Sequence, residues 1–377
     1  MKRRRLLLAA PALMAPGIHC AWAAELPSAP SVVKFGLSAS LTGGQAAYGK
    51  DISDGILAAF TAAAKVASDK GPRFELMTLD DGGDREKCKA NVKSFIGSGV
   101  SALLGLTSGA AAEASLPMIE EAQIALLGTA SGNMGIRGDK LTMPYHVRAG
   151  YDSEYKQMVR YVKDFGFQRV GYVYLKDTSP ANQAAMTAAL EAVGVKLTIS
   201  VPLDRNSKSF VAEADALLAA NLACVLFTTN AAPVEAIIAR MSTAKYAGTY
   251  FASSFAGQSL INAMAGKGIS IILSQVVPRP NAVALPIIKR FREDLAALGG
   301  DAKIGYTNLE GYIVGRVAVE AARAALIGGP LTRARFKSAL SDLNLDLGGY
   351  RVRFAGGKSG SSFVDIVALD RSGRIIG

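Results

Sequence analysis

Residues 102–110 read Ala-Leu-Leu-Gly-Leu-Thr-Ser-Gly-Ala, so that a short apolar run ends in glycine and hydroxyl residues before a longer amphipathic segment begins. This order is typical of a β-strand that passes directly into an α-helix. Residues 124–132 repeat the order one unit later, as Ile-Ala-Leu-Leu-Gly-Thr-Ala-Ser-Gly. Short strands that alternate with longer helices predict a parallel sheet covered by helices, which is the doubly wound α/β class.

Two series of such units follow each other along the chain. The first predicts strands near residues 32–38, 74–79, 102–104 and 124–127, with helices near 48–66, 85–96 and 111–122. The second begins after Arg148 and predicts strands near residues 170–174, 197–201, 225–228, 250–252 and 271–274, with helices near 152–165, 182–193, 210–218, 233–241 and 259–265. The chain therefore predicts two Rossmann-like domains.

The C-terminal part predicts three helices without strands between them, near residues 286–298, 309–326 and 333–340, and then β-rich sequence over 350–369. Helices without strands of their own must cover another sheet. We therefore expect the chain to return to the first domain after residue 278 and to cross again near residue 348. The expected lobes are residues 31–148 with 279–347 and residues 149–278 with 348–377, joined by a three-segment hinge.

The N-terminus predicts a secretory signal peptide over residues 1–23. Lys2 and three arginines precede the apolar residues 6–14, and Ala21-Trp22-Ala23 supplies a small-residue cleavage site. The apolar run is too short to span a bilayer. Cys20 follows His19, whereas lipid-modified cysteines follow a small residue, so we expect cleavage near Ala23 and export. The arginines leave both the general and the twin-arginine routes open.

Composition sets further bounds. Removing the leader takes four basic residues and no acid, which lowers the formal net charge from +11 to +7. The remaining basic residues form no cluster, so nucleic acid is not an expected partner. A mature chain of about 350 residues exceeds one ordinary core and predicts two domains. Cys88 and Cys224 fall in different domains, so neither a disulfide between them nor a zinc site is expected.

Motifs for enzymatic chemistry are weak. Residues 44–51 resemble a phosphate-binding loop but end in Asp51 where a Ser or Thr should bind Mg²⁺. His146 is the one histidine of the mature chain, and no Gly-x-Ser-x-Gly motif accompanies it. Asp80, Asp81 and Asp84 lack the spacing of a calcium loop, and capping of the next helix by Asp84 explains them. We expect no enzyme activity, no cofactor and no metal.

The glycine and hydroxyl residues at the two strand ends are better candidates. Thr107, Ser108 and Gly109 form one loop, and Thr129, Ala130 and Ser131 form the other. In open α/β sheets, ligands bind beyond the carboxyl ends of the strands, and helix N-termini attract anions. The two loops together predict a carboxylate site. Ordinary N-capping by Ser and Thr explains either loop alone equally well.

Taken together, these features resemble the type I periplasmic solute-binding proteins of the leucine/isoleucine/valine-binding family. The resemblance rests on residues 41–49 (Leu-Thr-Gly-Gly-Gln-Ala-Ala-Tyr-Gly), the Asp80-Asp81 pair and the two hydroxyl loops. It also includes residues 306–312 (Tyr-Thr-Asn-Leu-Glu-Gly-Tyr) and 147–149 (Val-Arg-Ala), and it covers essentially the whole mature chain. It implies two lobes that close on a ligand like a Venus flytrap.

The resemblance also implies positions for the ligand contacts. They are Tyr48, Thr107, Ser108, Gly109, Thr129, Ala130, Ser131, Tyr151, Asp177, Ala181, Asn230, Ser254 and Phe255. The sequence departs from the family where an acid should pair with a ligand ammonium, near Ser254, and where aromatic residues are expected, at Ala181 and Asn230. A buried ammonium without a counter-charge costs several kcal/mol.

We therefore expect a carboxylate without an α-amino group, such as a keto acid or an aromatic acid. Asp177 is the one residue that could supply the counter-charge from another direction and restore amino-acid binding. The resemblance implies a monomeric periplasmic protein that delivers its ligand to an inner-membrane ABC permease. The alternatives are a ligand sensor of the same fold and an exported α/β hydrolase that relies on His146.

Overall fold

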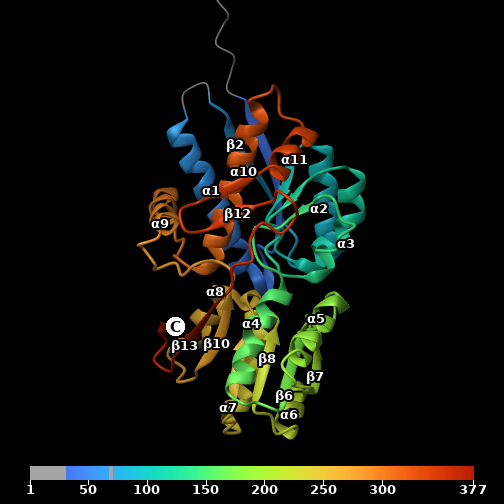
Figure 1. The fold of residues 1–377 in the computed structure, drawn as a ribbon, viewed down its shortest axis with the longest axis vertical. Helices are drawn as coiled ribbons and strands as arrows, with labels where there is room; N and C mark the ends of the chain where they lie inside the picture. Colours follow the sequence, from blue (N-terminus) through green and yellow to red (C-terminus); the bar gives the residue numbers. More distant parts are fainter. Residues whose placement is uncertain (1–30, 68–70) are drawn as a thin grey trace, which may run out of the picture.

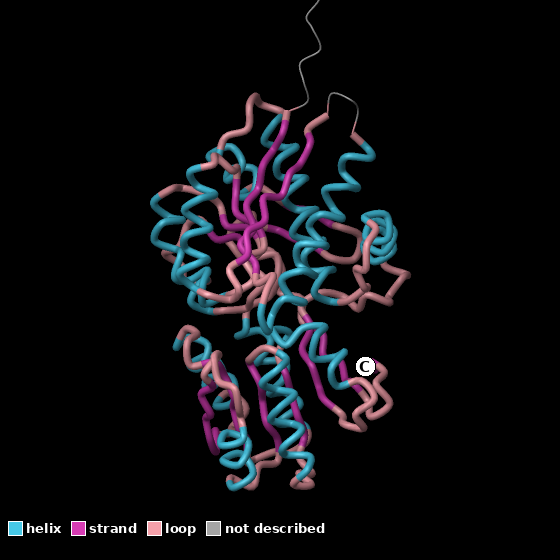
Figure 2. Tube along the Cα trace, turned by 180° about the vertical axis from the view of Figure 1, so that it is seen from behind, coloured by secondary structure: helices cyan, strands magenta, loops and turns pink. Residues whose placement is uncertain are grey.

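The computed structural model describes residues 31–67 and 71–377, so the predicted leader and its cleavage site lie outside the described residues. Figures 1 and 2 show two bodies joined at a narrow waist, each with a central sheet and helices around it. This is the predicted α/β architecture of two doubly wound lobes.

The first sheet has five parallel strands in the order β2-β1-β3-β4-β5. Phe35 of β1 lies opposite Leu76 of β2 and Ala102 of β3. The C-terminal helices return to cover this sheet, as expected for helices without strands of their own (Figure 1). The elements of this lobe are β1 (Val32–Ala39), η1 (Gly43–Gln45), α1 (Ala46–Val66), β2 (Arg73–Asp80), α2 (Arg85–Gly97), β3 (Ala102–Leu104), α3 (Gly109–Glu121), β4 (Leu126–Leu127), η2 (Met134–Ile136), β5 (Pro144–Tyr145), α9 (Pro286–Leu298), α10 (Tyr306–Leu326) and α11 (Arg333–Ser341).

The second sheet has seven strands in the order β14-β13-β10-β9-β8-β6-β7, of which β13 and β14 are antiparallel additions at one edge. The parallel strands β6 and β8 are almost entirely buried, as expected for strands covered by helices on both faces. The elements are α4 (Tyr151–Asp164), β6 (Val170–Leu175), α5 (Pro180–Glu191), β7 (Leu197–Leu203), α6 (Val211–Ala219), β8 (Cys224–Thr228), α7 (Ala231–Thr243), β9 (Thr249–Ala252), η3 (Ser254–Ala256), α8 (Gly257–Met264), β10 (Ile271–Gln275), β13 (Asp365–Leu369) and β14 (Ile375–Ile376).

The β-rich tail divides between the two lobes. β12 (Arg351–Arg353) pairs with β11 (Asn344–Asp346) in a small antiparallel sheet, and Gly348 and Gly349 form the turn between them, both at positive φ. Phe354 then packs edge-on against Tyr145 of the first lobe. The two glycines therefore form a hairpin turn. We propose that the first lobe extends to residue 360 and that the third crossing lies over 361–364, later than the sequence indicated.

One hydroxyl group, that of Tyr350, contacts two of the crossings. The Tyr350 hydroxyl oxygen lies 2.7 Å from the carbonyl oxygen of Val147, which belongs to the first crossing. It lies 3.1 Å from the carbonyl oxygen of Val276, which belongs to the second crossing. The Tyr350 ring packs edge-on against Phe363 of the third crossing, with ring centroids 5.9 Å apart. A single side chain thus contacts all three connecting segments.

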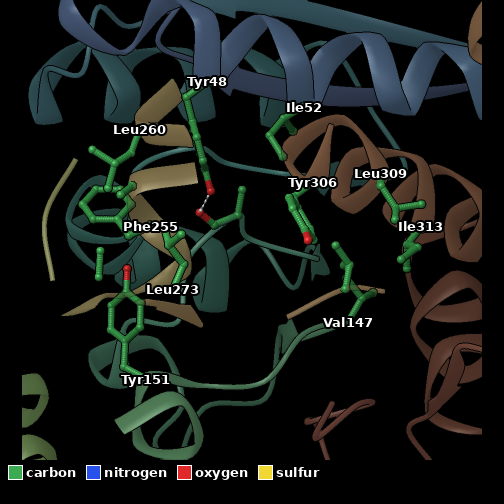
Figure 3. Packing of buried hydrophobic residues seen from close by; sticks show 14 of the residues in the cluster. Tyr48, Ile52, Val147, Tyr151, Phe255, Leu260, Leu273, Tyr306, Leu309 and Ile313 are labelled. Atoms are coloured by element: carbon green, nitrogen blue, oxygen red, sulfur yellow. Dashed lines mark hydrogen bonds between the residues drawn. The ribbon is translucent and has the colours of Figure 1, made fainter. Parts of the chain in front are cut away.

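Helices α1 and α10 pack against each other through glycines. A Cβ atom at Gly55 would lie 2.0 Å from the Asn308 carbonyl oxygen, and one at Gly311 would lie 2.3 Å from the Ile52 carbonyl oxygen. Figure 3 shows the two helices side by side, with Ile52 on one and Leu309 on the other. The absence of side chains at these positions lets the backbones approach closely, and this contact places Tyr48 at the end of the cleft between the lobes.

We predict that Gly311→Ala destabilises the protein by about 1–3 kcal/mol, because the added methyl group meets backbone that cannot move aside. Urea unfolding of the mature chain measures the change. Gly97→Ala is the matched control, because Gly97 ends α2 with no atom within 4 Å of its Cβ position. The control should stabilise by up to about 1 kcal/mol. Equal stability of the two variants would contradict the close packing of α1 on α10.

Candidate ligand-binding site

Aromatic side chains from both lobes meet where the lobes face each other. Tyr48 of α1, Tyr151 of α4 and Phe255 of η3 are all buried there (Figure 3). The Tyr48 hydroxyl donates to the Ala130 carbonyl oxygen at 2.8 Å, the dashed line in Figure 3, and its ring lies edge-on to Phe255 with centroids 6.3 Å apart. These residues, expected from the family resemblance, come together in the structure.

The first hydroxyl loop is already engaged within its own lobe. The Thr107 hydroxyl oxygen accepts the Ser40 N–H at 3.0 Å, and the Ser108 hydroxyl oxygen accepts the Ala111 N–H at 3.3 Å, which makes Ser108 the N-cap of α3. The capping alternative therefore holds for Ser108. What remains for a ligand is the N-terminus of α3 itself, where the N–H groups of the first turn have no intrahelical partner.

The second hydroxyl loop reaches the other lobe. The Ser131 hydroxyl lies 3.4 Å from the Tyr151 hydroxyl and accepts the Asn133 N–H at 3.2 Å. Thr129 has a buried hydroxyl oxygen with no hydrogen-bond partner among the described residues. Of the two loops, the second thus supplies the polar contact between the lobes.

A small inner cavity lies between these groups. Its volume is about 10 Å³, the space of about one water molecule. Its walls contain four of the individually predicted residues and six others. They are Gly109, Ser131, Tyr151 and Phe255, and Ala110, Asn133, Thr178, Asn182, Arg205 and Thr228. Both lobes contribute, so the cavity closes only when the lobes are in contact.

A second, outer cavity of about 690 Å³ opens between the lobes beside the inner one. Asp177 and Asn230, both predicted, line it, and Asn230 precedes the first turn of α7. Arg85 of α2 and Arg205 after β7 also line it. The volume falls within the range of small-molecule pockets.

The Asp177 carboxylate is neutralised by these arginines. Arg205 donates to its two oxygens at 2.9 and 3.2 Å, and Arg85 of the opposite lobe lies 3.8 Å from one of them and donates to the Asp177 carbonyl. Asp177 is therefore not a free counter-charge for an ammonium group. The sequence pattern alone offered no signal for Arg85 or Arg205, because both lie in loop or helix-start positions that basic residues commonly occupy.

Ala181 does not fill the role that the resemblance implied. Its side chain is exposed on α5, whereas its neighbour Asn182 is buried and faces the cleft. The Asn182 side chain donates to Asn133 at 2.9 Å and accepts the Met134 N–H at 2.8 Å. A helix turns by about 100° per residue, so a shift of one position moves the contact from Ala181 to Asn182.

Beneath the cleft, a buried ion network joins the lobes. Arg148 donates to Glu310 of α10 at 3.2 Å, to Glu154 of α4 at 2.6 Å and to the Ser254 hydroxyl at 2.5 Å. Arg148 and Glu154 are fully buried. Burial alone would lower the pKa of Arg148, but Glu310 and Glu154 hold it above the ordinary value. Burial raises the pKa of Glu310, against the lowering effect of Arg148.

Glu154 corrects the expectation that no acid lies near Ser254. Its carboxylate accepts the Ser254 N–H at 2.8 Å, the Ser254 hydroxyl at 2.9 Å and the Ser274 hydroxyl at 2.6 Å, besides the Arg148 contact. No local pattern in the sequence indicates this contact, because Glu154 lies 100 residues before Ser254 and only the packing of α4 brings the two together. With four donors, one of them Arg148, this carboxylate is satisfied within the protein and not free for a ligand.

His146 is buried away from any nucleophile. Its Nε2 atom lies 3.1 Å from the Ile136 carbonyl oxygen, and its Nδ1 atom has no hydrogen-bond partner among the described residues. Burial, with a smaller effect of Arg137, lowers its pKa well below the ordinary value. No serine or cysteine side chain in the described part of the chain bonds to its ring, so the geometry does not assemble a catalytic triad.

Two further features bear on the class of protein. No helix between residues 31 and 377, apart from the undescribed 68–70, has the length and apolar composition to cross a bilayer. Within the same ranges, His, Cys, Asp and Glu side chains nowhere gather in a group that could hold a metal ion. Asp84 caps α2 by accepting the Lys87 N–H at 2.8 Å, as predicted.

Two doubly wound lobes, a cleft lined from both and three crossings beneath it define a two-lobed solute-binding protein. The model of the periplasmic binding protein family matches residues 32–368. The chain belongs to this family.

Solved structures support the same fold. A possible leucine/isoleucine/valine-binding protein from Rhodopirellula baltica SH 1 is 23% identical, with 94% of this chain and 98% of that chain covered and a TM-score of 0.84. A branched-chain amino acid ABC transporter protein from Thermus thermophilus with bound valine is 16% identical, with 92% and 95% covered and a TM-score of 0.80. A solute-binding protein of an ABC transporter from R. palustris, in complex with 4-hydroxybenzoate, is 17% identical, with 90% and 93% covered and a TM-score of 0.75. Among curated proteins, none matches the sequence significantly.

We predict that Arg148→Met lowers the free energy of unfolding by about 3–5 kcal/mol at pH 7, because it leaves two buried carboxylates without their cation. The loss should be smaller at pH 5, because burial raises the pKa of Glu310 and this carboxyl group takes up a proton more readily there. Urea unfolding at both pH values measures it. Arg374→Met is the control: Arg374 is 79% exposed, so its ion pair with Asp370 contributes little. A control as destabilised as Arg148→Met would contradict the role of the network.

His146 should make the folded state sensitive to acid. The unfolded chain binds a proton at His146 near pH 6.5 whereas the folded chain does not, so this stabilisation is fully present above pH 6.5 and decreases below it. We expect the stability difference between the wild type and His146→Gln to fall by about 1.4 kcal/mol per pH unit below this value. Urea unfolding between pH 5 and 8 measures the two curves. Parallel curves would show that His146 titrates normally.

Proposed function

We propose that this protein is the exported solute-binding component of an ABC importer, and that its solute is a small carboxylate without an α-amino group. In this proposal the leader over residues 1–23 directs the chain to the periplasm, and the mature monomer passes its solute to an inner-membrane permease. No chemical step is part of the proposal. The relatives with bound valine and 4-hydroxybenzoate indicate that such lobes accept both amino acids and aromatic acids.

The observation that carries the choice of solute is the charge around the inner cavity. Among the described residues, its walls contain no acidic side chain and one arginine. Three nearby acids are paired with arginines within the protein, Asp177 with Arg205 and Arg85, and Glu154 and Glu310 with Arg148. An α-ammonium group buried here would lose its hydration without gaining a counter-charge, whereas a carboxylate gains one.

The size of the inner cavity supports closure as the mode of binding. A space of about one water cannot admit a carboxylate, so the lobes must separate before the solute enters. The crossings beneath the cleft then act as the hinge. Binding that favours the closed form shifts the population of the lobes toward it.

We expect 4-methyl-2-oxopentanoate to bind more tightly than leucine, because the two differ at the α-carbon in the group that replaces the amine. Thermal-shift and calorimetric measurements on the mature protein compare this pair, together with 4-hydroxybenzoate and phenylacetate. A solute at 100 times its Kd should raise the stability by about 2.7 kcal/mol. Small-angle scattering should show a smaller radius of gyration when the solute is present.

Tighter binding of leucine than of its keto acid would contradict the proposed solute class and restore amino-acid binding. Binding of any of these solutes without a change in the radius of gyration would contradict hinge closure.

A further inference from the structure

We propose that Arg205 is the residue that binds the carboxylate of the solute, from the second lobe, opposite the N-terminus of α3. This inference rests on the proposed function and names a contact that neither the sequence pattern nor the family resemblance indicated. Of the described residues, Arg205 alone lines both the inner and the outer cavity. Arg205 therefore lies where a solute would pass between the outer and the inner cavity.

The Arg205 guanidinium is held in place by Asp177. The Nε and Nη2 atoms donate to the two carboxylate oxygens at 2.9 and 3.2 Å, and only 16% of the side chain is exposed. No described group accepts a hydrogen bond from Nη1. A guanidinium fixed along one edge presents its remaining N–H groups in a defined direction, which suits the planar geometry of a carboxylate.

The local charge favours an anion. One Asp177 carboxylate faces two arginines, Arg205 from its own lobe and Arg85 from the opposite lobe. Asp84, Glu86 and Lys208 balance these groups over the outer cavity as a whole, whereas the described walls of the inner cavity contain Arg205 and no acid. A solute carboxylate at Arg205 would complete the charge balance, whereas an ammonium group would be repelled.

Polar groups on the cavity walls complete the site. Gly109 and Ala110, the first residues of α3, lie across the inner cavity on the first lobe, where N–H groups without intrahelical partners attract anions. Thr228 of the second lobe has a buried hydroxyl oxygen that meets no partner at hydrogen-bonding distance and angle among the described residues. An anion between Arg205 and α3 is attracted by both lobes at once, which favours a closed form whose inner cavity is wider than in this structure.

The Arg85–Asp177 contact lies across the mouth of the cleft. Both residues line the outer cavity on one side and a third cavity of about 260 Å³ on the other. Asp177 therefore links the position of Arg205 to closure of the lobes. The outer cavity leaves room for the body of the solute while its carboxylate is held at Arg205.

The test compares carboxylates with their neutral amides on the full mature chain. The probes are 4-hydroxybenzoate, phenylacetate and 4-methyl-2-oxopentanoate, each with its amide, measured by calorimetry. We expect wild-type protein to bind at least one acid about 100-fold more tightly than its amide. Arg205→Gln should weaken binding of that acid by about 100-fold and leave the amide nearly unchanged, so that the preference disappears. Asp177→Asn keeps the arginine charge and should weaken binding by less than about tenfold.

Arg240→Gln is the matched control, because Arg240 forms an exposed ion pair with Asp215 in the same lobe. It should leave the affinities unchanged. Unchanged acid affinity in Arg205→Gln, or equal loss for the acid and its amide, would overturn the role of Arg205 while leaving solute binding intact. Equal losses in Arg205→Gln and Asp177→Asn would assign the pair a purely structural role. Absence of binding by every probe to wild-type protein would overturn the proposed solute class together with Arg205.

Discussion

The Arg148 guanidinium is the charge on which the geometry of the cleft depends. A buried cation must find its partners inside the protein, and Arg148 finds Glu310 in the first lobe and Glu154 in the second. Each partner sits on a long helix, α10 or α4, so one cation fixes the helices of both lobes relative to the first crossing. The same requirement keeps the Glu154 carboxylate bound to Ser254 at the cleft, and its charge away from the solute.

Above this network, the polar groups of the cleft fall into two sets. The loop hydroxyls and amides of the first lobe bond mainly to their own backbone or to the facing lobe, as Thr107 bonds to Ser40 and Asn133 to Asn182. Those contacts shape and close the inner cavity. The charged groups gather farther out, around Asp177, where Arg85 and Arg205 approach from opposite lobes. The uncharged polar groups thus shape the bottom of the cleft, and the charged groups lie at its mouth.

The sequence predicted the helices and the longer strands because each has an apolar face with its own period, which local residues determine. β5 and β11 were missed because neither forms an apolar run: β5 begins with Pro144, and β11 is mostly exposed. The aromatic cluster of Tyr48 and Phe255 followed from a family resemblance. The partners of Glu154 and Arg205 depend on the packing of segments that are distant in the sequence, and no local pattern indicates such contacts. A crossing was predicted near Gly348 and Gly349, because glycines mark breaks in the chain, but the same residues serve equally well in the hairpin turn that they form.

The Tyr350 hydroxyl has one proton and two carbonyl oxygens within reach, at Val147 and Val276. Val147 and Val276 belong to the first and second crossings and follow β5 and β10, so the hydroxyl lies between two of the segments that join the lobes. Because its proton can bond to either carbonyl oxygen, a small shift of one segment relative to the other costs less than the loss of a whole hydrogen bond.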